Sequence, residues 1–147
     1  MEDSVFFYFN CNPKAKHTTD CVIRAICAAS EKPWMEVFRA LTDYTVQSGY
    51  MFNDERNYGN YLRDCGWEKQ PQPKDRNGKR IKVKTFLQTF TGTAVINAGK
   101  AHVSYVSDGF VWDIWNCENE IIGNYWIKAS GQTACAPSDS ACRSEKE

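Results

Sequence analysis

Residues 17–27 read His17-Thr18-Thr19-Asp20-Cys21-Val22-Ile23-Arg24-Ala25-Ile26-Cys27, and the fold is predicted around this stretch. Thr18, Thr19 and Asp20 carry side-chain oxygens that can accept the free backbone N–H groups at a helix start. Apolar residues follow with helical spacing, so we expect a buried helix that begins just before Cys21. A thiol at that place lies at the positive end of the helix dipole, which lowers its pKa from the free value of about 8.5.

Cys21 is therefore a candidate nucleophile, although a structural interpretation stands beside this one. Cysteine is among the residue types that are most often buried, and a cysteine in an apolar helix is commonly a small core residue. A nucleophilic cysteine also needs a base, usually a histidine, and a group that orients the base. The choice between the two interpretations depends on the rest of the chain.

The composition is that of an ordinary globular protein. The chain has 147 residues, of which 42% are hydrophobic and 14% aromatic, and we assign residues 1–129 to a single domain. Its 18 basic residues balance 18 acidic ones, so no excess of charge indicates nucleic acid or an anionic membrane as a partner. After Ala129 the sequence is rich in Ser, Gly, Thr, Pro and charged residues, which predicts a disordered tail over residues 130–147.

The sequence has no recognisable targeting segment or membrane span. No apolar run approaches about 20 residues, and the start Met1-Glu2-Asp3-Ser4 is acidic, whereas a signal peptide begins with basic residues. These features predict a cytoplasmic protein. The seven cysteines are an odd number in a chain without a secretion signal, so we expect reduced thiols.

Zinc binding is the main alternative role for so many cysteines. The closest pairs are Cys21 with Cys27 and Cys135 with Cys142, and neither has the short spacing of a zinc motif. Cys21 and Cys27 would lie about 240° apart around a helix of about 3.6 residues per turn. We therefore predict no metal and no other cofactor. The remaining cysteines of the domain are expected to be small buried residues: Cys27, Cys65 and Cys117.

The first half of the chain is predicted to be mainly helical. An aromatic run at residues 5–9 predicts a short strand or extended arm before the cysteine helix. A second helix is expected from Pro33, with Ser30 as a possible cap, to Gly49. A third helix, capped by Asn53 or Asp54, should end at Gly66.

The second half is predicted to be an antiparallel sheet. Residues 68–80 contain prolines, charges and an Asn-Gly turn, which predict a surface loop or small hairpin. A short amphipathic helix is expected within residues 83–90. Strands are expected over residues 93–97, 101–107, 110–115 and 121–128.

The dipeptide Asp108-Gly109 predicts a two-residue hairpin turn, which determines how the neighbouring strands pair. The resulting register makes His102 and Asp113 diagonal neighbours on one face, within hydrogen-bonding reach. Asp113 can then orient the imidazole, and Trp115 opposite His102 can shield their hydrogen bond from water. The alternative is a hairpin whose histidine and aspartate only line a solvated face. The other histidine, His17, lies in a polar loop, where exposure is the usual outcome.

The order of these features resembles the papain-like cysteine peptidase superfamily. The segment Asp20–Ile26, DCVIRAI, is similar to the helix start of small bacterial and phage members, including bacteriocin-leader-type peptidases. Ala101–Tyr105, AHVSY, with Asp108-Gly109 is similar to the histidine strand of the NlpC/P60 branch. The resemblance covers about residues 10–128. It implies an α+β papain-like fold, in which an N-terminal helical half packs its cysteine helix on a C-terminal antiparallel β-sheet.

The resemblance implies Cys21 as nucleophile, His102 as general base and then acid, and Asp113 as the residue that orients the histidine. The family also has an oxyanion-stabilising Gln shortly before the cysteine, and no Gln precedes Cys21 here. The amide of Asn12 is one candidate substitute. Thr18 or Thr19, together with the Cys21 backbone N–H, is the other.

The function that the resemblance implies is a thiol peptidase or isopeptidase of phage or bacterial origin. It would cleave an amide bond of a peptide or protein substrate through a thioester intermediate. A papain-like module that binds protein without cleaving it, as an adaptor or inhibitor, is the alternative, and the missing Gln and the five tryptophans are compatible with it. Selective labelling of Cys21 by a thiol probe, dependent on His102, would favour the enzyme.

Overall fold

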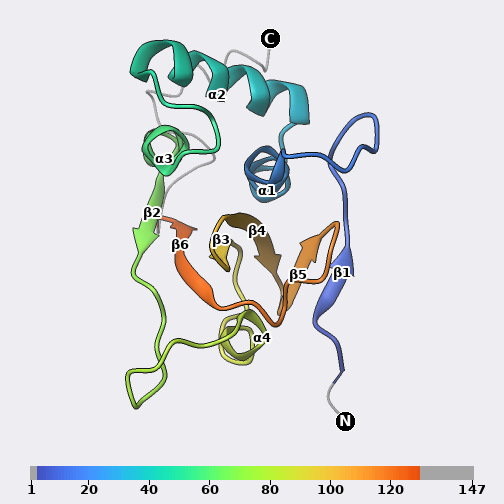
Figure 1. Ribbon diagram of the computed structural model, residues 1–147, viewed down its shortest axis with the longest axis vertical. Helices are drawn as coiled ribbons and strands as arrows, with labels where there is room; N and C mark the ends of the chain where they lie inside the picture. Colours follow the sequence, from blue (N-terminus) through green and yellow to red (C-terminus); the bar gives the residue numbers. More distant parts are fainter. Residues whose placement is uncertain (1–2, 130–147) are drawn as a thin grey trace.

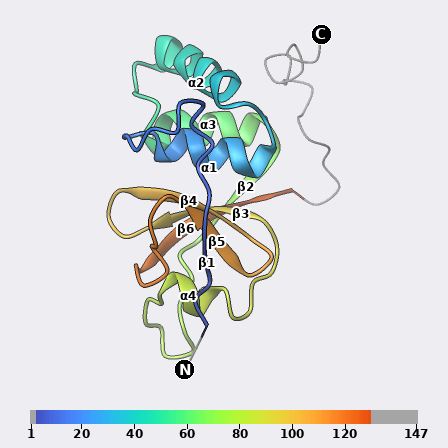
Figure 2. The ribbon, with the colours of Figure 1, turned by 90° about the vertical axis from the view of Figure 1, so that its right-hand side faces the viewer.

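The computed structural model describes residues 3–129, which form a mixed six-stranded sheet with helices on both faces (Figures 1 and 2). The helices are α1 (Cys21–Ser30), α2 (Trp34–Ser48), α3 (Glu55–Asp64) and α4 (Val83–Phe86). The strands are β1 (Phe6–Tyr8), β2 (Trp67–Gln70), β3 (Ala94–Ala98), β4 (His102–Ser107), β5 (Phe110–Asp113) and β6 (Ile122–Lys128). The α+β class is therefore as predicted.

The sheet has the strand order β1-β5-β4-β3-β6-β2, which corrects the predicted sheet at both edges. β3 to β6 pair with one another antiparallel, as predicted, but β1 pairs with β5 in parallel. β2 pairs antiparallel with β6 and extends from Trp67 into residues 68–80, for which the sequence predicts a surface loop or small hairpin. Both edge strands have only three or four residues, too few for a period to show their partners or direction.

The helix boundaries follow local sequence signals, with one correction. α1 begins at Cys21 as predicted, and the side chain of Asp54 caps α3 by accepting the Arg56 backbone N–H. Ser30 does not cap α2, because it is the last residue of α1 and Pro33 occupies the cap position. Gly49 ends α2 in a left-handed conformation, with φ 84°.

Two hydrophobic clusters cover the two faces of the sheet, because successive strand residues point to opposite faces. Val95, Val103 and Trp126 pack against α1, α2 and α3. Ile96 and other apolar residues of the sheet pack against α4. In Figure 1, α1 lies over the centre of the sheet and α2 forms an outer layer above α1 and α3. This layering brings the start of α1 close to the start of β4.

The predicted tail, residues 130–147 with Cys135 and Cys142, lies outside the described residues. The longest helix of residues 3–129 is α2, with 15 residues. None of the helices in this range combines the length and the apolarity that a membrane span requires.

Candidate active site

The β4–β5 hairpin has the predicted turn, and its three strand pairs have the predicted register, but β5 ends at Asp113, two residues before the predicted end of the strand at residue 115. Asp108 and Gly109 form the turn with φ values of 56° and 83°. The strands pair Ser107 with Phe110, Val106 with Val111, and Tyr105 with Trp112. His102 begins β4 and Asp113 ends β5, so the open end of the hairpin brings the two side chains together.

His102 and Asp113 form a short, largely buried hydrogen bond. The Nε2 atom of His102 lies 2.6 Å from Oδ2 of Asp113, whose side chain is 1% exposed. Burial alone would lower the pKa of His102, but hydrogen bonds with Asp113, Cys117 and Cys21 and the charge of Asp113 raise it to about 11. Burial would conversely raise the pKa of Asp113, and the His102 contact and other hydrogen bonds lower it. The pair is therefore imidazolium and carboxylate at neutral pH.

The thiol of Cys21, at the start of α1, contacts the His102 ring. Burial would raise its pKa, but hydrogen bonds from the His102 ring and the Val103 backbone N–H, with the charges of His102 and Arg24, lower it. Because Nε2 of His102 is engaged by Asp113, Nδ1 is the ring nitrogen left for the sulfur. Cys21 and His102 thus favour a thiolate–imidazolium pair.

Arg24, one turn after Cys21 on α1, links the helix to the hairpin. Its Nε donates to Asp20 at 2.8 Å and its Nη1 donates to Asp113 at 2.9 Å. All three side chains are at most 7% exposed. Arg24 therefore neutralises both carboxylates and holds Asp113 against the helix that carries Cys21.

The carboxylate of Asp20 accepts hydrogen bonds from side chains around Arg24 and does not cap α1. Besides the Arg24 bond, its Oδ2 accepts from the Asn12 side-chain amide at 3.0 Å and from the Trp34 indole N–H at 2.9 Å. The Asp20 side chain makes no hydrogen bond to the first turn of the helix. The predicted side-chain cap is therefore wrong for Asp20, whose carboxylate does not satisfy the first-turn N–H groups of α1.

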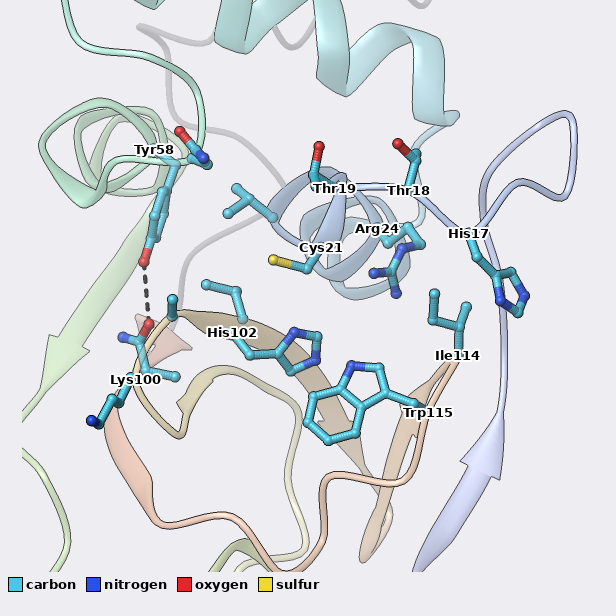
Figure 3. A pocket seen from close by; sticks show the side chains of 15 residues that line it. His17, Thr18, Thr19, Cys21, Arg24, Tyr58, Lys100, His102, Ile114 and Trp115 are labelled. Carbon is cyan, nitrogen blue, oxygen red and sulfur yellow. Dashed lines mark hydrogen bonds between the residues drawn. The ribbon is translucent and has the colours of Figure 1, made fainter.

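An open cavity of about 750 Å³ lies where α1, α3 and the hairpin meet (Figure 3). Its lining residues come from these three elements, from β3 and from the adjoining loops: His17, Thr18, Thr19, Cys21, Val22, Arg24, Asn53, Tyr58, Asn97, Lys100, Ala101, His102, Val103, Ile114 and Trp115. The sulfur of Cys21 and the ring of His102 both point into it. A substrate can therefore reach the thiol.

The residues proposed to stabilise an oxyanion do not reach the sulfur. Asn12 is not among the lining residues, because its amide nitrogen serves the buried Asp20. Thr18 and Thr19 line the cavity, but in Figure 3 their hydroxyls point away from Cys21. The predictions for Asn12 and for the threonine hydroxyls are thus not supported by the geometry.

Trp115 lies beside the His102 ring and His17 is exposed, as the sequence predicts. The Trp115 ring lies 4.7 Å from the His102 ring between centroids and covers one side of it, while remaining 42% exposed. His17 stands at the cavity rim, and its Nε2 is hydrogen-bonded to the Tyr8 hydroxyl at 3.0 Å. In Figure 3 its ring is turned away from Cys21, whereas the His102 ring faces the sulfur.

Asp113 also has buried neighbours that were not predicted as site residues. The Ser104 hydroxyl donates to Oδ2, the Ile114 backbone N–H donates to Oδ1 at 2.7 Å, and the Cys117 sulfur lies 3.8 Å from Oδ2. Ser104 stands opposite Asp113 in the predicted register, and Arg24 is a charged residue on an apolar helix four residues after Asp20. These two signals were present in the sequence, whereas nothing in it distinguished Cys117 from a core residue.

His102, Asp113 and Cys117 are also the group, among the described residues, that could hold a metal ion. Their candidate ligand atoms lie within 4.8 Å of one another. However, the Arg24 guanidinium lies 2.9 Å from the Asp113 carboxylate and opposes a second cation there. The donors around Asp113 fit a carboxylate that orients a histidine better than a metal ligand.

Comparison with known proteins returns no match: no family model, curated protein or solved structure matches this chain.

Proposed function

We propose that this chain is a thiol-dependent acyl hydrolase that cleaves an amide bond, in the manner of the papain-like peptidases that its motifs resemble. The observation that carries the proposal is one contact chain, in which the accessible Cys21 thiol meets His102 and the far ring nitrogen of His102 meets buried Asp113. A nucleophile, a base and an orienting group in that order are what acyl transfer requires. We propose a peptide or protein as the substrate.

The reaction follows from the ionisation of the pair. The Cys21 thiolate attacks the carbonyl carbon, a C–S bond forms, and the carbonyl π electrons move to oxygen. When this intermediate collapses, the C–N bond breaks and the amine leaves with the proton from imidazolium His102, which leaves a thioester on Cys21. Neutral His102 then takes a proton from water, and the hydroxide attacks the thioester. The acid is released and the thiol regenerated.

The test is the pH dependence of alkylation by iodoacetamide, with the modified cysteine identified by mass spectrometry of peptides. Because the pKa of Cys21 is lowered, we expect its alkylation rate to reach its plateau below the pH at which an ordinary thiol ionises. His102→Ala should shift the midpoint upward by about one unit or more, because the group that stabilises the thiolate is lost. Cys21→Ala should abolish hydrolysis of a fluorogenic peptide library while leaving the fold intact.

Two other cysteines provide matched controls. Cys11 is partly exposed and has a lowered pKa, mainly through a hydrogen bond with Cys27. The pKa of Cys27 is raised, mainly by its hydrogen bond with Cys11. Cys11→Ala should leave the labelling of Cys21 unchanged, and Cys27→Ala should chiefly reduce stability. A Cys21 midpoint that is ordinary in the wild type, or that is unaffected by His102→Ala, would refute the proposal.

A further inference from the structure

Acyl transfer through Cys21 needs a donor for the negative oxygen of the tetrahedral intermediate. Such donors are placed close to the nucleophile, where water is excluded, and removing one costs about 100- to 1,000-fold in rate. The start of α1 offers backbone N–H groups, but the side chains of Asn12, Thr18 and Thr19 do not point to the sulfur. A second donor has to come from another element.

Tyr58 of α3 is the lining residue whose place and chemistry fit this role. It is 3% exposed, yet its hydroxyl reaches the cavity and lies across from the Cys21 sulfur in Figure 3. The charge of Cys21 acts on it, which places the hydroxyl within electrostatic range of the nucleophile. Asn53, Thr18 and Thr19, by contrast, are exposed at the rim of the cavity.

The hydrogen bonding of Tyr58 leaves its proton free to move to a better acceptor. Its hydroxyl donates to Oδ1 of Asn97 at 3.4 Å, which is long for an O–H···O bond. Asn97 is held in place because its amide donates to Oδ1 of Asn124 at 2.9 Å. An oxyanion is a stronger acceptor than a neutral amide oxygen, so the proton of Tyr58 can swing from Asn97 to it.

Tyr58 also stays protonated while the site works. Burial raises its pKa above the ordinary value, and the charges of Glu55 and Cys21 act in the same direction. The hydroxyl therefore remains a neutral donor beside a thiolate.

We propose that the Tyr58 hydroxyl is a catalytic group that, with the backbone N–H of Cys21, stabilises the oxyanion formed during acyl transfer. This inference rests on the proposed function and extends it by a residue from a third element. The carbonyl carbon of the substrate would meet the sulfur from the cavity, with its oxygen between the start of α1 and Tyr58.

The experiment compares two reactions of the same thiol. Acylation by p-nitrophenyl acetate passes through a tetrahedral oxyanion, whereas alkylation by iodoacetamide is a direct displacement and forms none. Tyr58→Phe should reduce the Cys21 acylation rate constant by about 100-fold or more and change the alkylation rate and its pH midpoint by no more than about twofold. Tyr125→Phe, which removes a hydroxyl from the α4 side of the sheet, is the matched control and should leave both rates unchanged.

Each other outcome has a distinct meaning. Acylation that is unchanged in Tyr58→Phe would overturn the role of Tyr58 while leaving the thiol hydrolase intact. Equal losses in acylation and alkylation would also overturn it, because Tyr58 would then act on the thiolate or on the fold, and the thermal unfolding midpoint separates these two causes. Absence of Cys21-dependent acylation in the wild type would refute the proposed function itself.

Discussion

At the scale of single residues, Arg24 is the least expected part of the site. A cation on the buried face of an apolar helix is costly unless it is paired, and Arg24 is paired twice, with Asp20 and Asp113. The same charge also lowers the pKa of Cys21. One guanidinium thus contributes to stability, to the position of Asp113 and to the ionisation of Cys21.

Arg24→Met should therefore destabilise the protein strongly. It would leave the buried Asp20 carboxylate without a cation and Asp113 with only His102, which we expect to reduce the free energy of unfolding by about 3–5 kcal/mol. Urea unfolding followed by circular dichroism measures this loss. The matched control is Arg56→Met, because Arg56 pairs with Asp54 at the surface and such pairs contribute about 1 kcal/mol or less. Similar losses in the two variants would contradict the role of the Arg24 network.

At the scale of elements, the β4–β5 hairpin and α1 each provide part of the site through local sequence. The Asp108-Gly109 turn determines the register, and the register brings His102 and Asp113 together. A strand pair slipped by one residue would turn His102 to the opposite face. The turn is therefore a requirement for the site even though it lies at the far end of the hairpin.

Gly109→Ala tests this dependence. Gly109 has φ 83° with open space where a Cβ would stand, so the cost is one of backbone conformation and not of collision. We expect a loss of about 1–2 kcal/mol in the free energy of unfolding, measured in urea. Gly109→Asn should lose less, because Asn tolerates the left-handed region better than Ala. Equal losses for Ala and Asn would show that the backbone conformation of the turn does not limit stability.

The hairpin also illustrates what a sequence can predict at this scale. Its turn, its strands and the His102–Asp113 contact all follow from local patterns, because pairing through a two-residue turn involves neighbours along the chain. The edge strands β1 and β2 could not be predicted in the same way. The aromatic run at residues 5–9 predicts a short strand or extended arm, but the partners and directions of both edge strands depend on β5 and β6, about 105 and 60 residues further along the chain, and short segments carry no period that shows such partners.

At the scale of the whole molecule, the site lies where the helical layer meets the end of the sheet. Cys21, Arg24 and Tyr58 come from helices, and His102 and Asp113 from strands. The charged groups between the layers link the stability of the fold to the ionisation of the site. His102 is the clearest example, because its pKa is raised to about 11 from an ordinary 6.5.

The contribution of His102 to stability should therefore depend on pH. Protonated His102 stabilises the fold, so its contribution is fully present below pH 6.5 and is lost as pH rises toward about 11. Cys21 acts in the opposite direction, because its pKa is lowered, so the comparison is made in a Cys21→Ala background. Asp113 and Cys117 still raise the pKa of His102 in that background.

We expect the free-energy difference between Cys21→Ala and Cys21→Ala/His102→Gln to be largest in mildly acidic solution and to shrink as the pH is raised through this window. Urea unfolding at a series of pH values measures it. A difference that does not change with pH would mean that His102 is not held as an imidazolium in the folded protein.

The sequence by itself determined the helix start at Cys21, the hairpin with its register, and the pairing of His102 with Asp113, because each depends on residues close together in the chain. Only the tertiary structure decided how these parts meet. The packing of α1 over β4 brings the thiol to the imidazole, directs Asp20 and Asn12 into the Arg24 network, and turns Tyr58 toward the cavity. The contacts of Cys21 with His102 and of Arg24 with Asp113 join residues more than 80 positions apart, and their partners are selected by shape and buried charge, which no local pattern encodes.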